Sequence, residues 1–504
     1  MASVYRALSF SFIERFVLIG VSLFSYILIA RLLTPEEIGI YSVSVALIAI
    51  GQVVREFGIG NFLIQEKDLT EAHIRTAFGV SFLIGGVLFF AFFLGAPLIG
   101  SFYKDERMTW IMRIVAINFL VMPFCSISLS LLRRDMQFDR LMRVNVIASV
   151  IGVAVTLGLA FYKFGPQSLA WGAIASNIAT GFGAWFERKK RQPLLPSLSE
   201  WRKVVKFGGQ SAGVAIITTI AMDINDLVVG RVLGFAPAAI ISRANGLVNL
   251  FNQQVMGAVR SVALPAFARA HRVGEPLEPL YVASVAAVTA IAWPFYGFVA
   301  LHSPEILRLM FGPQWDASAP LVPIFCLAGA LTATVNLALT LVIAIGRNDV
   351  AVKADFIVQP IRALVMVGAI LVFKSLEAIA WAWLLVNVLV TPYFHCVKNR
   401  LIHTNIAAMR TGLVKSLSLA IISISVSKSI MLSLFFIGMN TSSTINIILE
   451  FTLLMFFWYS TIFTIGHSLS QDKFILKIRT KIISIAPLMT IMLPSSPLAK
   501  FSKK

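Results

Sequence analysis

The sequence ERKKRQPLLPSLSEWRKVVK, residues 187–206, is the densest basic run in an otherwise apolar chain. A short spacer from Pro193 to Pro196 divides its basic residues into two groups. About half of the long apolar segments of the chain precede this run, and the rest follow it. We therefore interpret the run as a linker between two membrane-embedded halves.

The composition of the chain indicates a membrane protein. Its 504 residues are 58% hydrophobic and only 13% charged, and the mean hydropathy is +0.84. Soluble proteins carry about 25% charged residues, so this chain has too few to cover a water-facing surface. Apolar stretches of about 20 residues recur along the whole length, as in polytopic helical membrane proteins. The predicted fold class is therefore all-α, with many transmembrane helices.

The net charge of +19 would suggest nucleic-acid binding in a soluble protein. Here the basic residues lie in short loops between apolar segments, so membrane topology explains them better and no nucleic-acid partner is expected. Cys125, Cys326 and Cys396 lie in apolar segments without a close pair, so we expect buried thiols. The six histidines show no ligand spacing, and neither a metal nor a cofactor is expected.

The apolar segments give about 14 candidate spans by length and by the polarity of their flanks. The first follows Arg6 and shows no small-residue cleavage site, so we expect a transmembrane helix there rather than a removed signal peptide. The predicted spans are 8–30, 38–63, 78–100, 110–132, 143–162, 166–186, 208–230, 237–259, 280–301, 318–345, 354–373, 376–397, 412–437 and 442–466.

Basic residues concentrate in every second loop between these spans. Arg133, Arg134 and the linker run lie in one set of loops, whereas the alternate loops hold few lysines or arginines. Because cytoplasmic loops carry the excess of Lys and Arg, we place the basic loops and both termini in the cytoplasm.

Two internal matches predict a duplication. Ala30 to Leu33 correspond to Gly230 to Leu233, 200 positions later, and Ala170-Trp171 with Asn177 correspond to Ala380-Trp381 with Asn387. Parallel repeats of this kind are a known transporter architecture, with the substrate site between the halves. We predict an N-terminal six-helix bundle, a basic cytoplasmic linker, a second six-helix bundle, a pair of additional transmembrane helices and a basic cytoplasmic tail, over residues 1–186, 187–206, 207–402, 403–470 and 471–504.

Charged residues within the predicted spans are the candidate functional residues, because a charge at mid-bilayer costs about 2.5–3.5 kcal/mol on insertion scales. Helical spacing places several polar residues on shared faces, with amides on the eighth span and Gln359 near Arg362 on the eleventh. Guanidinium groups suit phosphate and carboxylate oxygens, so we predict a cationic cavity between the halves. Its predicted lining residues are Arg15, Arg55, Arg243, Asn245, Asn249, Asn252, Gln359 and Arg362.

The alternative for these charges is structural pairing, for example between Asp355 and Arg362, which share a helix face. Asp223 and Asp226 are separate candidates that would bind a coupling cation or proton, or act as counter-ions of the arginines. The residues do not decide between these roles. Arg260 lies at the end of a predicted span, where we expect its side chain to snorkel to the membrane interface.

Several motifs resemble one known family. The segment Ile29–Tyr41, IARLLTPEEIGIY, is similar to the opening motif of bacterial polysaccharide flippases, and Phe57-Gly58-Ile59-Gly60 continues the likeness. The segments 225–234, 242–244 and 264–267 also match, so the resemblance covers about the first 400 residues. Such proteins form the polysaccharide transporter family of the multidrug/oligosaccharidyl-lipid/polysaccharide exporter superfamily. One departure is Ala239-Ile240-Ile241, where such proteins often have Gly-Tyr-Tyr.

The resemblance implies alternating access by two six-helix bundles, with the first, second, seventh and eighth helices lining the cavity. It implies a transporter that flips undecaprenyl-diphosphate-linked oligosaccharide repeat units for exopolysaccharide or lipopolysaccharide biosynthesis. The implied partners are this lipid-linked oligosaccharide, membrane lipids and, as candidates, polysaccharide polymerase or export proteins.

Two other transport functions and one enzymatic function stay open as alternatives. A peptidoglycan-precursor flippase is separated only weakly by the sequence, and a multidrug/cation antiporter of the same superfamily would favour an acidic cavity. A membrane glycan polymerase or ligase is least favoured, because such a reaction needs an external catalytic loop. Even the outward segment from His302 to Ala319 has connector length. We therefore predict no enzymatic activity.

Overall fold

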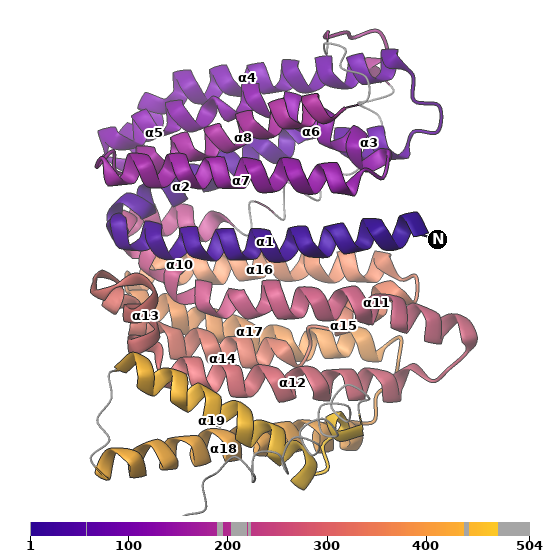
Figure 1. Ribbon diagram of the computed structural model, residues 1–504, viewed down its shortest axis with the longest axis vertical. Coiled ribbons are helices and arrows are strands. Elements are labelled where there is room, and N and C mark those ends of the chain that lie inside the picture. The colour runs from indigo at the N-terminus through magenta and orange to yellow at the C-terminus, as the bar shows by residue number, and fades with distance from the viewer. Residues whose placement is uncertain are drawn as a thin grey trace, which may run out of the picture. The chain divides into compact units, whose positions relative to one another are not determined.

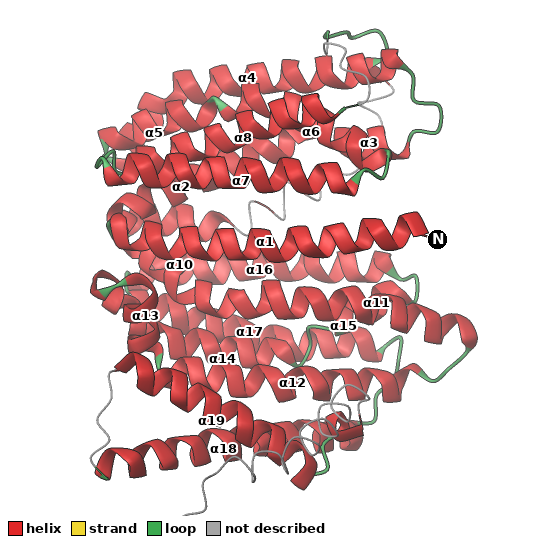
Figure 2. Ribbon diagram, in the orientation of Figure 1, coloured by secondary structure: helices red, strands yellow, loops and turns green. Residues whose placement is uncertain are grey.

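The computed structural model describes residues 2–56, 58–188, 195–202, 219, 223–437 and 443–471. Within these ranges the regular structure is helical (Figure 2). Figure 1 labels the helices in chain order. The α-helices are α1 Ala2–Leu32, α2 Pro35–Glu56, α3 Ile59–Gln65, α4 Glu71–Tyr103, α5 Glu106–Ala116, α6 Asn118–Arg134, α7 Phe138–Phe161, α8 Gln167–Glu187, α10 Phe235–Leu250, α11 Met256–Val273, α12 Leu277–Leu301, α13 Ser303–Phe311, α14 Val322–Ala333, α15 Ala338–Ala344, α16 Asn348–Phe373, α17 Leu376–Asn399, α18 Ile406–Phe436 and α19 Ser443–Thr464. A π-helix, η1, covers Phe251–Val255, two 3₁₀-helices cover Pro313–Leu321 (η2) and Ser468–Gln471 (η3), and residues 223–232 are also helical.

The all-α membrane fold class is confirmed. In the described part of the chain, 11 helical segments are long and apolar enough to cross a membrane. The total of about 14 spans stays a prediction, since most of the seventh predicted span lies outside the described residues. The basic tail after residue 471 and residues 189–194 and 203–206 of the predicted linker also lie outside them.

Four predicted spans are interrupted helices. Gly58 adopts a left-handed φ of 65° and separates α2 from α3, and Ile117 separates α5 from α6. The π-helix η1 joins α10 to α11, and a turn at residues 334–337 separates α14 from α15. Hydropathy identifies the apolar length of a span but not these breaks, which depend on backbone geometry and on polar partners.

The start of α2 explains three residues of the opening motif, Thr34, Pro35 and Glu37. Thr34 Oγ1 accepts a hydrogen bond from the Glu37 backbone N–H at 3.3 Å, and the Glu37 carboxylate accepts one from the Thr34 N–H at 2.8 Å. This reciprocal pair is a capping box, and Pro35 occupies the first helical position, where its missing N–H costs nothing. The motif therefore sets where α1 ends and α2 begins.

Contacts divide the chain into two compact units. Unit 1 contains Met1–Leu247, Ile306–Phe325 and Lys353–Val386, and unit 2 contains Val248–Glu305, Cys326–Val352 and Asn387–Lys504. The predicted domain boundaries stay a proposal.

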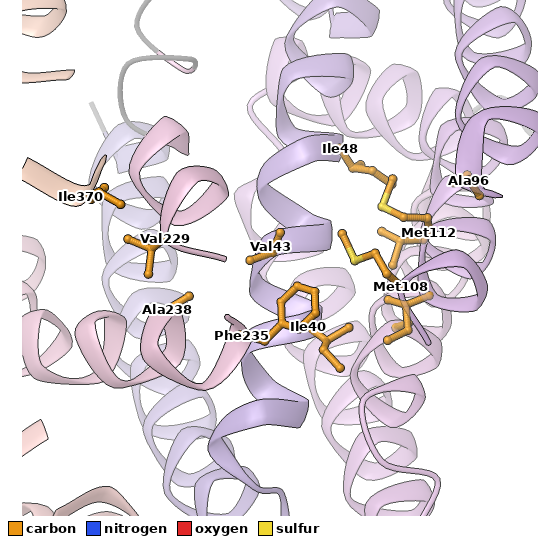
Figure 3. Close-up of a cluster of buried hydrophobic side chains, with 14 of the residues drawn as sticks. Ile40, Val43, Ile48, Ala96, Met108, Met112, Val229, Phe235, Ala238 and Ile370 are labelled. Atoms are coloured by element: carbon orange, nitrogen blue, oxygen red, sulfur yellow. The ribbon is translucent and has the colours of Figure 1, made fainter. Parts of the chain in front are cut away.

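In unit 1, helices from the N-terminal half pack side by side. Helix α7 contacts α1 and α8, and α4 contacts α5 and α6 (Figure 1). A buried core joins these helices to later segments of the same unit. Figure 3 shows Ile40, Val43 and Ile48 of α2 between Met108 and Met112 of α5 and the side chains of Val229, Phe235 and Ala238.

Two glycines bring α2 close to the helix at residues 223–232 and to the start of α10. A Cβ atom on Gly39 would lie 1.9 Å from the Phe235 carbonyl oxygen, and a Cβ atom on Gly230 would lie 2.7 Å from Val43 Cγ2. Small residues of this kind let helix backbones approach closely in membranes. Nearby, the Tyr103 hydroxyl donates to the Leu227 carbonyl at 3.2 Å. The glycines of the motif are therefore needed for the close packing of these helices.

The described part of the linker, residues 195–202, packs on the start of α4 in unit 1. The Ser197 N–H donates to the Arg75 carbonyl at 3.2 Å, and His73 Nε2 lies 3.0 Å from a Glu200 carboxylate oxygen. A Cβ atom on Gly79 would meet the Ser197 carbonyl oxygen at 2.2 Å. This part of the linker is therefore fixed to a transmembrane helix.

In unit 2, the last two transmembrane helices attach to α12. The Thr289 hydroxyl of α12 donates to Ser416 Oγ of α18 at 2.9 Å, and Trp458 Nε1 of α19 donates to the Ala290 carbonyl at 2.7 Å. Ala290, Leu419 and Ile462 form a buried core between these helices. Small and hydroxyl-bearing residues at the contact are typical of helix association in lipid.

The cysteine prediction is partly wrong. Cys125 and Cys326 are buried free thiols as expected, but Cys396 is exposed. Cys396 and its apolar neighbours lie on a membrane-spanning helix, where an apolar side chain faces lipid as readily as protein. An apolar neighbourhood in the sequence therefore does not predict that a thiol is buried.

Candidate functional site

Arg55 is the most deeply buried of the predicted cavity residues. It lies in the last turn of α2, and the whole residue is 1% exposed. Its Nε and Nη1 atoms are buried and have no hydrogen-bond partner among the described residues. The carboxylate of Glu56, the next residue, attracts its charge. A buried guanidinium with free N–H groups is costly unless an anion or water binds it, so Arg55 is a candidate anion-binding residue.

Arg243 of α10 lies in a cage of three aromatic rings. The guanidinium carbon is 3.9 Å from the ring centroid of Tyr26, 4.4 Å from that of Trp315 and 4.6 Å from that of Phe311. Arg243 is 4% exposed, and its Nη1 has no hydrogen-bond partner in the described part of the chain. Each cation–π contact contributes up to about 2 kcal/mol when it is shielded from water.

The cage is held together by the end of α1. Trp315 Nε1 donates to the Ala30 carbonyl at 2.9 Å, and Arg31 Nε donates to the Met310 carbonyl at 3.3 Å. Ser318 Oγ of η2 donates to the Ile240 carbonyl of α10 at 3.0 Å. These bonds connect α1, η2 and α10 around Arg243 and fix the position of its charge.

Gln359 and Arg362 share the half-buried face of α16 that the sequence predicts. The Gln359 Oε1 and Arg362 Nε atoms are buried without a hydrogen-bond partner among the described residues. The Arg362 guanidinium lies 5.0 Å from the ring centroid of Trp383 on α17. Asp355 is exposed and interacts electrostatically with Arg362. The expected structural pair is thus present only as a longer-range attraction, and no ion pair within 4 Å joins the two in the described structure.

Arg15 lies on an exposed position of α1, and its neighbour Glu14 accepts a hydrogen bond from Asn145 Nδ2 of α7 at 2.6 Å. Asp226 accepts a hydrogen bond from the Ser42 hydroxyl of α2 at 3.4 Å, and Asp223 is near enough to repel it. Neither aspartate forms an ion pair with an arginine of the described segments. Their role as coupling-ion or counter-ion residues stays a prediction.

The amides predicted for the eighth span are divided by η1. Asn245 and Asn249 are half-buried on α10, whereas Asn252 lies in η1 and belongs to a separate network in unit 2. Arg260 Nη1 donates to Asn336 Oδ1 at 2.7 Å, and Asn336 Nδ2 donates to Asn252 Oδ1 at 3.2 Å. The expectation that Arg260 snorkels is therefore wrong, because its guanidinium donates to the Asn336 side chain and to the Asn252 backbone carbonyl.

The amides of the internal repeat have polar partners in both units. Asn177 Nδ2 donates to Asn118 Oδ1 at 2.7 Å, and Asn387 Oδ1 accepts from the Thr332 hydroxyl at 3.2 Å. Asn118 and Thr332 belong to the fourth and tenth predicted spans, which are equivalent in the proposed duplication. The matched positions thus make matched contacts.

One buried carboxylate, that of Glu450 on the last α-helix α19, is absent from the residues that the sequence predicts to be functional. Glu450 of α19 is 4% exposed, lies 3.1 Å from His302 Nε2 without hydrogen-bond alignment, and lies 3.7 Å from Lys428 Nζ. The same argument that singled out Arg55, a charge within an apolar span, would have found Glu450. The aromatic cage of Arg243 had no such signal, because its rings come from distant segments.

Within the described residues no hydrogen bond joins Arg55, Arg243 and Arg362 to one another, and the cavity predicted for them and Arg15 stays a proposal. What the geometry establishes is a set of buried or half-buried guanidinium groups in unit 1. In an apolar surrounding these groups attract phosphate or carboxylate oxygens.

Comparison with known proteins gives one family and several relatives. A family model described as "Polysaccharide biosynthesis protein" matches residues 28–320. The lipopolysaccharide biosynthesis protein WzxC of Escherichia coli (strain K12) is 24% identical over 345 residues, which are 68% of this chain and 70% of WzxC. The teichuronic acid biosynthesis protein TuaB of Bacillus subtilis (strain 168) is 23% identical over 339 residues, 67% of this chain and 70% of TuaB. The succinoglycan biosynthesis transport protein ExoT of Rhizobium meliloti (strain 1021) is 23% identical over 332 residues, 66% of this chain and 67% of ExoT.

Two solved structures share the fold. The lipid II flippase MurJ in an inward closed conformation superposes with a TM-score of 0.70 at 15% identity, covering 90% of this chain and 98% of MurJ. An inward-facing multidrug resistance transporter of the MATE family superposes with a TM-score of 0.61 at 16% identity, covering 75% of this chain and 93% of the transporter. At this identity the likeness concerns the fold.

Proposed function

Because the chain belongs to the polysaccharide biosynthesis protein family, we propose that it is a membrane transporter that flips lipid-linked oligosaccharide repeat units for surface polysaccharide biosynthesis. The names of its relatives include transport and biosynthesis proteins of lipopolysaccharide and succinoglycan, which supports this substrate class. The finer proposal is an undecaprenyl-diphosphate carrier that moves from the cytoplasmic to the periplasmic leaflet of the bacterial inner membrane, with both termini in the cytoplasm.

The observation that carries this proposal is the buried guanidinium of Arg55, whose Nε and Nη1 atoms have no hydrogen-bond partner among the described residues. A diphosphate offers several anionic oxygens, and Arg donates parallel N–H groups that suit them. The lipid tail of such a substrate stays in the bilayer while only its headpiece enters the protein. Arg243 and Arg362 provide further positive charge in the same unit, and the flanking amides of Asn245 and Gln359 provide groups that bind sugar hydroxyls.

Alternating access is the mechanism that the fold supports best. The headpiece would bind to the arginines while the protein opens to the cytoplasm, and a movement of the two six-helix bundles would then expose it to the other side. Asp223 and Asp226 are proposed to take part as coupling-ion or counter-ion residues. Such a cycle needs no covalent chemistry, so we propose that the protein is not an enzyme.

The test is complementation of a deletion strain. Deletion should stop export of the surface polysaccharide and cause lipid-linked repeat units to accumulate on the inner leaflet. Wild-type protein should restore export, whereas Arg55→Gln should reduce it at least about tenfold, the loss of one charge-assisted contact. Arg269→Gln removes an exposed charge on α11 and serves as the matched control.

Two results would count against the proposal. Unchanged glycan export after deletion of the gene would contradict the proposed transport function. Full export by Arg55→Gln at normal protein level would remove Arg55 from the binding site. Rescue of a strain depleted of its peptidoglycan-precursor flippase would instead support the alternative transport substrate.

A further inference from the structure

The ends of α1 and α13 leave backbone carbonyls that their own helices do not satisfy. The Ala30 carbonyl would ordinarily accept from the Thr34 N–H, but that N–H donates to the Glu37 carboxylate at 2.8 Å. In α13, the Leu309 carbonyl would accept from the residue four positions later, which is Pro313 and has no N–H. Both helix ends therefore need hydrogen-bond donors from elsewhere in the chain.

The donors for the end of α1 come from η2. Trp315 Nε1 donates to the Ala30 carbonyl at 2.9 Å. Gln314 Nε2 donates to the same carbonyl and to that of Leu33, the latter at 3.1 Å. These donors lie 281–285 positions further along the chain than the carbonyls that they bind. The end of α1 is thus completed by a segment that follows the predicted linker.

Arg31, at the end of α1, makes the reciprocal contact with α13. Its Nε donates to the Met310 carbonyl at 3.3 Å, and its Nη2 donates to the Leu309 carbonyl. Other helices are closed by their own chain: the Lys104 N–H donates to carbonyls of α4, and the Gly274 N–H to carbonyls of α11. The last carbonyls of α1 and α13 depend instead on a contact between distant segments.

This contact is of a kind that can open and close. Arg31 and Gln314 are exposed, so water replaces their hydrogen bonds when the two ends separate. A hydrogen bond that is exchanged for water contributes little net stability, so the contact is reversible. Tyr26 of α1 and Trp315 of η2 lie on opposite sides of it, and both rings cover Arg243. Separation would therefore also uncover the Arg243 guanidinium.

The distribution of basic loops puts this contact at the end of the protein away from the cytoplasm. Two more contacts between segments before and after the linker lie at the same ends of the predicted spans. The Tyr103 hydroxyl donates to the Leu227 carbonyl at 3.2 Å, and Gly39 packs on the Phe235 backbone. A transporter that works by alternating access has to separate such contacts to release its substrate on that side.

We propose that the mutual capping of α1 by Gln314 and Trp315, and of α13 by Arg31, is a latch that holds the protein closed on the side away from the cytoplasm. The latch opens to release the bound headpiece and closes again afterwards. Since the proposal rests on the proposed alternating access, its test measures opening of the latch on the purified protein, separately from glycan export.

The test measures how fast a thiol placed at the latch reacts with a water-soluble maleimide. The reporter is Leu33→Cys, because Leu33 is 2% exposed and its carbonyl belongs to the latch. The exposed native thiol is removed by Cys396→Ser, whereas the buried thiols of Cys125 and Cys326 stay as an internal reference. Mass spectrometry identifies which cysteines have reacted.

Weakening the latch should expose the reporter. The double variant Arg31→Gln with Gln314→Ala should raise the labelling rate of the reporter at least about tenfold, because it weakens or removes the donors at both helix ends. Arg107→Gln is the matched control. It removes an exposed arginine at the same end, but its partners Glu36 and Asp105 lie before the linker, as Arg107 does. This control should be labelled at the wild-type rate.

Three results would overturn the latch. The first is equal labelling of the double variant and the control. The second is equal acceleration at Cys125 and Cys326, which would mean that the double variant unfolds as a whole rather than opens at this contact. The third is continued glycan export after Arg31→Cys and Gln314→Cys have been joined by a bismaleimide, since the two ends would then not need to separate. Export that is independent of the wild-type protein would instead contradict the transport function and leave the labelling result unaffected.

Discussion

Replacing Gly39 with alanine tests whether α2 and the start of α10 are in backbone contact. The new Cβ atom would lie 1.9 Å from the Phe235 carbonyl oxygen and 2.5 Å from its carbonyl carbon. Carbon–oxygen contacts are normally at least about 3.3 Å, so the atoms must separate by about 1.4 Å. Both opposing atoms belong to the backbone, and no rotation of a side chain can provide this space.

The separation would spread to the neighbouring contacts of the same interface. Gly230 packs on Val43 beside Gly39, and the Tyr103 ring stacks on Phe235 with 5.7 Å between centroids. Overpacking of a well-packed core costs about 1–3 kcal/mol, and Gly39→Ala should fall at the upper end, because two helices must move. The expected result is a clearly lower unfolding temperature of the detergent-purified protein, measured by intrinsic tryptophan fluorescence.

A second glycine provides the matched control. Gly86 lies within α4, and a Cβ atom there would have no heavy atom within 4 Å. Alanine in place of a helical glycine lowers the entropy of the unfolded chain, so Gly86→Ala should be neutral or stabilising by up to about 1 kcal/mol. If Gly39→Ala unfolds at the same temperature as Gly86→Ala, the close approach of the two backbones is refuted.

Three further changes test other contacts. Arg243→Lys keeps the charge but loses the planar group that stacks on three rings, so it should destabilise the protein by about 2 kcal/mol in thermal unfolding; unchanged stability would deny the cage a structural role. Glu450→Gln removes the buried carboxylate beside His302 and Lys428 and should cost only about 1 kcal/mol, because the Lys428 side chain is half-exposed, seen as faster proteolysis of the last two helices; wild-type resistance would contradict the pairing. Asp105 caps α5, and although burial raises its pKa, hydrogen bonds from Arg107 outweigh burial and hold the pKa below the usual value. Its stabilisation is therefore present above about pH 4 and lost as the pH falls through the lower folded-state value, and Asp105→Asn should remove this part of the pH dependence of unfolding.

The sequence predicted features that are local to one helix. Apolar length indicated the membrane class, and helical spacing placed Gln359 and Arg362 on one face. The internal repeat pointed to Asn177 and Asn387, which do make matched polar contacts. Apolar length and helical spacing persist in the folded chain because they depend on neighbours within a few residues, whereas the repeat contacts join residues 59 and 55 positions apart.

The partners of the charged residues were not predictable in the same way. Arg243 is surrounded by rings from α1, α13 and η2, and no spacing in the sequence connects those segments. Arg260 lies at a span end, where a free arginine would snorkel, but Asn336 reaches it from a turn that interrupts another helix. The partner of each charged residue depends on how the helices are arranged and on where they are interrupted. Hydropathy gives no information on either feature.

The surroundings of Arg55 and Arg243 indicate which of the two guanidinium groups gains more from binding an anionic substrate. An arginine taken out of water loses hydration, and something in the protein or its ligand must offset that loss. Around Arg243 three aromatic rings offset the loss of hydration. The charge of Arg243 is therefore stabilised whenever the cage is intact, with or without substrate. Around Arg55 the described residues offer no hydrogen-bond acceptor to Nε or Nη1. An anionic headpiece would therefore gain more from binding Arg55, because it meets N–H groups without partners, whereas at Arg243 it would compete with the rings. A bound diphosphate should accordingly stabilise the wild-type protein and the Arg243→Lys variant against heat, but not Arg55→Gln.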